Sequence, residues 1–318
     1  MRSSQGSARA TGAELNGFIV IDKPKGPTSH QVDYWIRTIT GTERVGHVGT
    51  LDPQVTGVLV VALGDATKLI EVAHEQSKEY VCVMLLHRDV PTERLQQVFQ
   101  EFTGDIYQLP PVKSAVSRSI RVRRIHSLSL VERDGRYVMF RVVCESGTYI
   151  RTLCVDMGYA LGTGAQMVEL RRVRTGPFTE KEAVTLQQVS DAFALLKAGD
   201  ARLVKSVVKP MVSLFSDVPK VVVKKSAVEN IAHGSDLYAG GIKHIIGHPG
   251  PGDRVCVITD DNQVVGTGKM LVPHDSMDSL KVVDFDRVLV KPREPAGRKK
   301  PDVRKERKVV RGQARRGH

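Results

Sequence analysis

Strand-like and helix-like segments follow one another in residues 17–215 without a regular strand–helix–strand order. Apolar residues at helical spacing predict helices near residues 28–40, 95–104, 150–162 and 186–197. Runs rich in β-branched and aromatic residues predict strands at 18–21, 58–63, 80–86, 128–131 and 137–144. This order favours an α+β fold, a mixed and largely antiparallel sheet with flanking helices, over a doubly wound parallel sheet.

The texture of the sequence changes after Pro210. Glycine-, proline- and aspartate-rich turns separate short apolar runs, which predicts a small β-barrel of about 75 residues. Its one helix is expected to begin with a capping box made by Ser226 and Glu229 and to end at Gly234. We predict strands in this part at residues 220–223, 254–258, 264–271, 280–285 and 288–290.

The length of 318 residues suits two unequal domains. The domains are expected at residues 17–215 and 218–290, between a flexible N-terminal extension at 1–16 and a basic tail at 291–318. The chain carries a net charge of +12, and residues 291–318 contribute +9 of it. Such a tail, which lacks aromatic residues, is predicted to be disordered and acts either as an RNA-binding arm or as a solubilising or targeting extension.

No segment predicts a membrane span or a secretory signal. The longest apolar run, Val58 to Leu63, is far shorter than a span needs. A cytoplasmic location, or a nuclear one, is therefore expected. The four cysteines form no CxxC pair and have no histidines at zinc-ligand spacing, so neither a disulfide nor a metal is expected.

Two local basic stretches fit either a phosphate backbone or a solvated strand face. Residues 108–126 hold five Lys or Arg and no acid, and residues 169–176 hold Arg171, Arg172 and Arg174. Arginine and lysine on phosphates position a protein without reading sequence. Charge alone leaves both interpretations open.

A glycine-spaced loop at residues 46–53 stands before the apolar run 58–63. Pro53 disfavours helical angles at Asp52, so this carboxylate is expected on a loop at the end of a buried strand. That placement suits a nucleophile, although an Asp-Pro turn is more often only a turn.

Two further residues strengthen the case for catalysis. Arg151 falls in the first turn of the helix predicted at 150–162, where a guanidinium paired with Asp52 would hold the carboxylate ionised. Tyr80 begins a strand and offers an aromatic face for stacking on a base. Taken singly, each is better explained as an exposed helix arginine or a core tyrosine.

The order of several motifs resembles the TruB/dyskerin family of pseudouridine synthases. The resemblance covers about residues 17–215 as the catalytic domain, and residues 218–290 resemble the PUA domain that follows it. The motifs are 22–30 (DKPKGPTSH), 46–57 (GHVGTLDPQVTG), 78–80 (KEY), 108–111 (QLPP), 147–153 (GTYIRTL) and 169–172 (ELRR).

The resemblance implies an enzyme that isomerises uridine in RNA, with a role for each matching residue. Asp52 matches the nucleophile, Tyr80 the tyrosine that stacks on the target base, and Arg151 the partner of the aspartate. The substrate-binding residues that it implies are His47, near the flipped nucleotide, Leu170, an apolar pocket residue, and Lys23, whose motif supports the pocket. The reaction is redox-neutral and requires no cofactor, and the base must leave its stack to be processed.

Within the family, residues 79–83, 114–116 and 226–228 resemble the archaeal and eukaryotic dyskerin branch. That branch implies an H/ACA ribonucleoprotein in which guide RNA selects an rRNA uridine, small accessory proteins assist, and the location is nucleolar in eukaryotes. A stand-alone enzyme acting on the T-loop uridine (position 55) of tRNA is the nearest alternative. A non-catalytic RNA scaffold is the alternative of another class.

Overall fold

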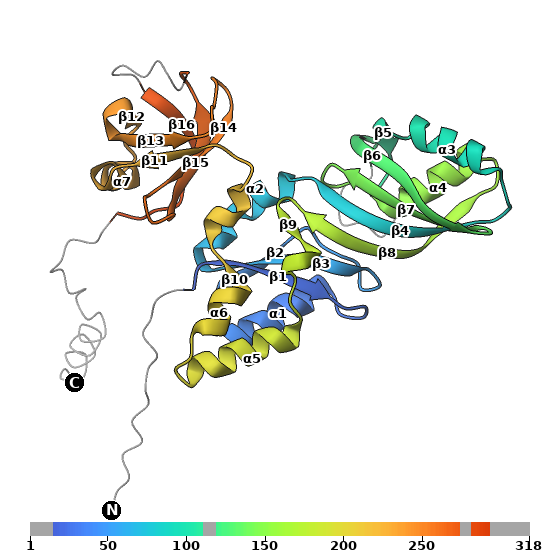
Figure 1. The fold of residues 1–318 in the computed structure, drawn as a ribbon, viewed down its shortest axis with the longest axis horizontal. Helices are drawn as coiled ribbons and strands as arrows, with labels where there is room; N and C mark the ends of the chain where they lie inside the picture. The colour runs from blue at the N-terminus through green and yellow to red at the C-terminus, as the bar shows by residue number, and fades with distance from the viewer. Residues whose placement is uncertain (1–14, 111–118, 274–280, 293–318) are drawn as a thin grey trace, which may run out of the picture.

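The computed structural model describes residues 15–110, 119–273 and 281–292. One ten-stranded sheet contains β10, β1, β3, β8, β4, β7, β6 and β5 as successive neighbours, with β2 paired to β3 and β9 to β8 (Figure 1). Every neighbouring pair is antiparallel except β3 with β8. The predicted α+β fold is therefore confirmed. The strands are β1 Gly17–Lys23, β2 Val45–Val48, β3 Thr56–Leu63, β4 Lys78–Leu86, β5 Gly104–Gln108, β6 Arg121–Asp134, β7 Tyr137–Cys144, β8 Ala165–Thr175, β9 Phe178–Thr179 and β10 Val208–Lys209.

Four helices lie where the apolar spacing predicts them, whereas the short helices at Ile70–Glu75 and Arg202–Val207 were not predicted. The first begins at a capping box, because the Thr28 hydroxyl accepts from Gln31 N (3.1 Å) and the Gln31 side chain accepts from Thr28 N (2.8 Å). It ends at Gly41, which adopts a left-handed φ of 70°. The helices are α1 Ser29–Thr40, α2 Ile70–Glu75, α3 Thr92–Glu101, α4 Ile150–Ala160, α5 Leu186–Lys197 and α6 Arg202–Val207.

Strand β3 is buried on both faces, which explains its unbroken apolar run. Leu59 and Val61 pack with Val32 of α1 and Val189 of α5. The alternate residues, such as Val60, enter a second cluster on the opposite face. The loop that carries Asp52 therefore leads directly into a strand that is covered on both faces.

The outer half of the sheet is covered by α3 and α4 (Figure 1). Strand β7 alternates buried and more exposed residues, the pattern of an antiparallel strand with one face on a core. Phe140 of β7 packs against Phe99 of α3 with ring centroids 5.6 Å apart. This packing fixes α4, the helix that carries Arg151.

Residues from Lys220 onward form a separate six-stranded sheet in the order β12, β16, β15, β14, β11, β13. Two predictions in this part are wrong. Ser226 makes no cap, because the helix begins one residue earlier and its N-cap is Lys224. The runs at 280–285 and 288–290 belong to one strand and its end. The elements are β11 Lys220–Val223, α7 Lys225–Ala232, β12 Leu237–Tyr238, β13 Ile242–Ile246, β14 Arg254–Ile258, β15 Val264–Met270 and β16 Lys281–Val288.

The two sheets share a core and ionic contacts. Val222 and Ile258 of the C-terminal sheet belong to the same apolar cluster as Val60. Arg254 pairs with Glu75 of α2 at 3.2 Å, and Arg287 pairs with Glu71 at 2.5 Å. The C-terminal sheet is thereby connected to α2 of the N-terminal part.

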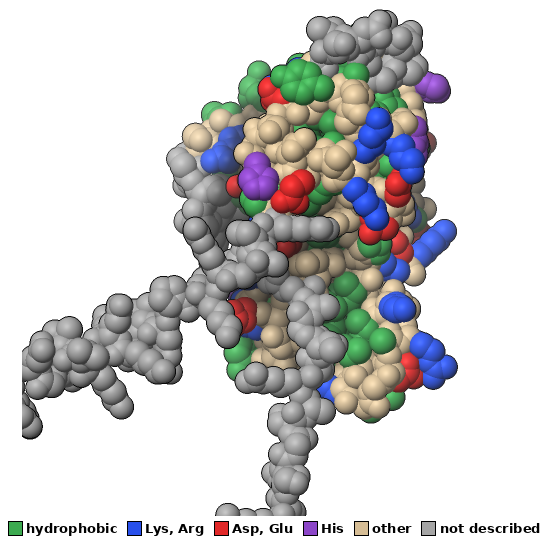
Figure 2. Space-filling model, turned by 90° about the vertical axis from the view of Figure 1, so that its left-hand side faces the viewer, with side chains coloured by type: hydrophobic (Ala, Val, Ile, Leu, Met, Phe, Trp, Pro, Cys, Tyr) green, Lys and Arg blue, Asp and Glu red, His purple; other side chains and the backbone are tan. Residues whose placement is uncertain are grey.

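No helix in the described ranges is long and apolar enough to cross a membrane. Most of the N-terminal extension and most of the basic tail, together with residues 114–116, lie outside the described residues. On the face drawn in Figure 2, Lys and Arg side chains alternate with Asp and Glu along one edge. The described part of that face therefore carries mixed charge.

Candidate active site

The Asp52 loop joins β2 to β3 and presents its carboxylate to solvent. The side chain of Asp52 is 64% exposed. The loop turns at Gly49, whose φ of 70° is left-handed, and a Cβ there would lie 3.3 Å from Arg172 Nη1. A glycine suits both requirements.

Lys23 supports the backbone of the Asp52 loop on its buried side. Its buried ammonium donates to the carbonyls of Pro24 (2.9 Å), Pro27 (2.9 Å) and Pro53 (3.4 Å). Burial lowers the pKa of Lys23, and the nearby Asp52 carboxylate acts in the opposite direction. The Lys23 ammonium faces inward and supports the loop, and a role of Lys23 in substrate binding stays a prediction.

Arg172 and Ser29 also form hydrogen bonds with the backbone of this loop. The Arg172 guanidinium, which is 1% exposed, donates to the carbonyls of Val58 (2.7 Å) and Gly49 (2.9 Å). Ser29 Oγ donates to Leu51 O (3.1 Å) and accepts from Leu51 N (2.9 Å). The backbone on both sides of Asp52 is thus fixed before any substrate binds.

In the basic stretch at 169–176 the buried Arg172 fits neither of the two open interpretations, and the other two arginines form ion pairs within the protein. Arg172 is buried, Arg171 pairs with Asp22 (3.0 Å) and Glu180 (2.5 Å), and Arg174 pairs with Glu79 (2.9 Å). The partners of the three arginines lie on β1, β3 and β4, in the Asp52 loop and directly after β9, so the sequence alone did not reveal them.

In the stretch 108–126, Lys113 and Arg118 lie outside the described residues. Arg123 pairs with Glu145 at 2.8 Å, and Arg124 pairs with Asp105 at 3.5 Å. Arg124 keeps a side chain that is 61% exposed. A phosphate contact from this stretch stays a prediction.

Arg151 meets Asp52, the contact that the resemblance implies. Arg151 Nη2 lies 3.4 Å from Asp52 Oδ2, and its side chain is 52% exposed. The start of α4 is fixed by Gln108, whose amide donates to Tyr149 O (3.1 Å) and accepts from Tyr149 N (2.9 Å). An exposed pair adds little stability, so its value lies in orienting the carboxylate.

Tyr80 and Leu170 form the apolar part of the site. Both are partly buried, and both pack against the same two clusters, one on each half of the sheet. Burial raises the pKa of Tyr80, while the adjacent Arg172 guanidinium lowers it. The phenol therefore keeps its proton at neutral pH, and Arg172 links Tyr80 to the Asp52 loop.

His47 contacts the loop from β2. Its Nε2 lies 3.0 Å from Thr50 Oγ1, and its Nδ1 donates to Asp33 Oδ2 at 2.6 Å. The ring lines a surface pocket of about 520 Å³ next to α1. A role near a flipped nucleotide stays a prediction for this residue.

Sequence reasoning missed Lys78 as a supporting residue. Lys78 is 3% exposed and donates to Gln76 O at 2.6 Å and to His74 O. Burial, with a contribution from Arg172, lowers the pKa of Lys78 to about 8. Its place in the KEY motif was the only signal. Asp33 was also missed, although its spacing from His30 puts both on one face of a helix.

Comparisons with known proteins agree with this geometry. Residues 37–150 match the N-terminal domain of TruB family pseudouridylate synthase, residues 151–216 the C-terminal domain of tRNA pseudouridylate synthase B, and residues 219–289 the PUA domain. The chain is 58% identical to a probable tRNA pseudouridine synthase B of Picrophilus torridus and 57% identical to one of Thermoplasma volcanium. These matches cover 87% and 89% of this chain and 80% of each relative.

Solved structures give the same result. The chain is 41% identical to a chain of a Cbf5-Nop10-Gar1 complex, with a TM-score of 0.78 and 87% of each chain covered. It is 40% identical to a chain of an H/ACA RNP bound to a substrate RNA containing 2′-deoxyuridine, with a TM-score of 0.78 and 86% and 85% covered. The exposed Asp52–Arg151 pair on an anchored loop, the motif order and these matches together establish that the chain belongs to the TruB/dyskerin family and is a pseudouridine synthase with a C-terminal PUA domain.

Proposed function

We propose that this pseudouridine synthase is the catalytic subunit of an RNA-guided complex and that Asp52 is its nucleophile. In the reaction the bond from ribose C1′ to uracil N1 breaks and a bond from C1′ to C5 forms. A proton leaves C5 and N1 gains one, so the isomerisation balances without an oxidant or reductant. Attack by a carboxylate would give the covalent intermediate that lets the base turn.

One observation carries the assignment of Asp52. Its carboxylate is exposed, ion-paired with Arg151 and mounted on a backbone that Lys23, Ser29 and Arg172 fix from both sides. A carboxylate held in one place has little orientational entropy to lose when substrate arrives. Arg151 pairs with this carboxylate and orients it for attack.

The other residues have supporting roles in the proposal. The Tyr80 ring stacks on the uracil. Leu170 packs beside it as an apolar wall, since both contact the same clusters. His47, tied to the loop through Thr50, lies near the flipped nucleotide.

The guided mode is supported by the solved relatives. Two chains about 40% identical to this one occur in a Cbf5-Nop10-Gar1 complex and in an H/ACA RNP with substrate RNA. We therefore propose that guide RNA, rRNA and small accessory proteins of that kind are partners, with the PUA domain holding the guide. The alternative, stand-alone action on tRNA, is supported by the names of the curated relatives.

The test of Asp52 compares two matched aspartates. Asp52→Ala should abolish pseudouridine formation while leaving RNA affinity within a few-fold, because the carboxylate attacks the substrate but adds little binding. Asp105→Ala is the control, since Asp105 is similarly exposed and also pairs with an arginine at 3.5 Å. Product is measured by chemical derivatisation of pseudouridine in the RNA. Undiminished isomerisation by Asp52→Ala contradicts the assignment, and RNA binding by a wild type that forms no product would favour the scaffold alternative.

The mode of action needs a second experiment. The purified chain is assayed alone on tRNA, and with guide RNA and accessory proteins on an rRNA fragment. Guide-dependent product in the second assay supports the proposal. Activity on tRNA alone, with none on the guided substrate, assigns the stand-alone mode instead.

A further inference from the structure

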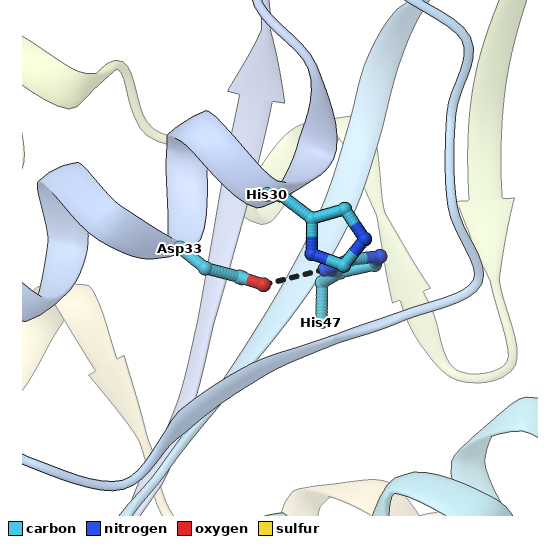
Figure 3. A group of neighbouring side chains, drawn as sticks. All are labelled: His30, Asp33 and His47. Atoms are coloured by element: carbon cyan, nitrogen blue, oxygen red, sulfur yellow. Dashed lines mark hydrogen bonds and ion pairs between the residues drawn. The ribbon is translucent and has the colours of Figure 1, made fainter.

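Three side chains of types that bind metals, His30, Asp33 and His47, lie together. They meet on the side of the His47 ring that faces away from Thr50. His30 and Asp33 are three residues apart near the start of α1 and therefore face the same way. His47 comes from β2, the strand that packs beside this helix (Figure 3). One ligand atom from each of the three residues lies within 4.8 Å of the other two.

One carboxylate oxygen of Asp33 lacks a hydrogen-bond partner among the described residues. The residue is 7% exposed, and its Oδ2 accepts from His47 Nδ1 at 2.6 Å. Its Oδ1 is buried and has no hydrogen-bond partner in the part of the chain that the structure describes. A buried carboxylate oxygen without a partner destabilises the fold, and a cation bound by both Asp33 oxygens would remove that cost.

We propose that His30, Asp33 and His47 bind a divalent transition-metal ion, with zinc the best match. Two imidazoles and one carboxylate are the ligand types that zinc prefers, and three protein ligands leave a fourth position for water. The open pocket of about 520 Å³ lined by these residues gives that position access to solvent. The sequence-based expectation of no metal rested on the cysteines, which take no part in this cluster.

Small movements suffice to form the site. Ligand atoms about 2.0 Å from a tetrahedral ion are about 3.3 Å apart, so the metal would replace the hydrogen between Asp33 and His47 and widen their 2.6 Å separation. His30 must move inward. Its side chain is exposed, and its ring meets that of His47 edge to face at a centroid distance of 5.0 Å.

One nearby cation acts against metal binding. Arg37 lines the same pocket, but its guanidinium donates to the carbonyls of Glu43 (3.2 Å) and Val45 (3.5 Å). Those bonds hold its charge at the start of β2. Because the proposed ion joins α1 to β2, it would stabilise the strand that leads into the Asp52 loop.

Titration of the purified, untagged full chain with Co²⁺ tests the proposal without RNA, so the result is independent of the proposed function. Wild type should bind one equivalent with visible absorption bands that Zn²⁺ abolishes. His30→Ala and Asp33→Asn should each weaken binding roughly tenfold or more. His244→Ala, at an exposed histidine of β13, is the control and should bind like wild type.

Thermal unfolding gives a second measurement. Zn²⁺ should raise the melting temperature of wild type and of His244→Ala, because a ligand that binds only the folded state stabilises it. It should not raise that of His30→Ala, a variant of an exposed side chain that is expected to fold. No saturable Co²⁺ binding by wild type, or equal binding by His30→Ala, overturns the proposal and leaves the Asp33–His47 contact as an orienting hydrogen bond.

Discussion

Three buried cations surround the backbone of the Asp52 loop. Lys23, Lys78 and Arg172 are each at most 3% exposed, and each donates to main-chain carbonyls. Burial lowers the pKa of all three. They place positive charge beneath the loop that carries the Asp52 carboxylate.

The exposed Arg151–Asp52 ion pair is expected to matter for catalysis but not for the stability of the fold. Arg151→Met should lower kcat roughly 100-fold, because the carboxylate loses its orientation. The free energy of unfolding should change by less than about 0.5 kcal/mol, since the pair is exposed. Activity assays and denaturant titration measure the two effects.

The matched control for this variant is Arg124→Met. Arg124 and Asp105 are 3.5 Å apart and 61% and 59% exposed, close to the values of the Arg151–Asp52 pair. The control should leave kcat unchanged, whatever it does to RNA affinity. Equal reductions of kcat in both variants would contradict a specific role for Arg151.

Lys78 gives the protein a pH-dependent stability. Its pKa falls from 10.5 to about 8 on folding, so between pH 8 and pH 10.5 the unfolded chain binds more protons than the folded one. Stability from this group therefore rises with pH across that window, by up to about 3 kcal/mol. Below pH 8 the lysine is charged in both states and its penalty is constant.

The measurement compares wild type with Lys78→Met by denaturant unfolding at pH values from 7 to 10.5. The stability of wild type relative to the variant should increase with pH in the upper part of this range. Lys197→Met, at an exposed lysine near the end of α5, controls for general alkaline effects. A difference that stays flat with pH would show that Lys78 titrates normally.

At the scale of elements, local patterns predicted most of the helices and strands but not the central strand β8. The box at Thr28 and Gln31 predicted the start of α1, and the stretch at 137–144 matched β7. Strand β8 contains four charged residues among its eleven, so it was interpreted as a basic surface. Only pairing with β3 and β4 explains a buried arginine there.

The candidate site likewise contains some residues that the sequence predicted and others that it did not. Asp52, Tyr80 and Arg151 were found through motifs, and the Asp52–Arg151 contact is present. The roles of Lys23, Lys78, Ser29 and Asp33 depend on contacts between segments distant in sequence. Charge and spacing along the chain do not encode those partners.

The turn at Gly49 connects the stability of the fold with the position of the Asp52 carboxylate. Gly49→Ala should destabilise the fold by about 1–2 kcal/mol and lower kcat, because alanine is strained at a φ of 70° and its Cβ would press on Arg172 Nη1 at 3.3 Å. Gly135→Ala is the matched control. It has a φ of 54° with no atom within 4 Å of the added Cβ, so it bears only the backbone strain.

Chemical unfolding and steady-state kinetics on both glycine variants measure the outcome. The control should lose similar backbone energy and keep full kcat. If Gly49→Ala also kept full kcat, packing of the loop against Arg172 would not position Asp52.

At the scale of the whole molecule, the two sheets are joined by shared contacts, and the chain before its basic tail has a nearly balanced charge. The PUA domain is fixed to α2 through Arg254 and Arg287 and through a shared apolar cluster. Residues 1–290 carry only +3 of the net +12. Long-range attraction to RNA is therefore expected to depend on the tail, while the body supplies shape and chemistry.

Deletion of residues 298–318 tests this division, because it removes a net charge of +8. For every RNA phosphate that the tail neutralises, the deletion should reduce the slope of log affinity against log salt by about 0.7–0.9. RNA affinity should therefore fall at low salt and converge with that of wild type as salt rises, whereas the melting temperature should hold, since the cores of both sheets are built from residues before 298. A full-length variant with the ten Lys and Arg of this segment changed to Gln separates charge from chain length and should behave like the deletion. An unchanged salt slope in both would mean that the body, despite its balanced charge, makes all the phosphate contacts.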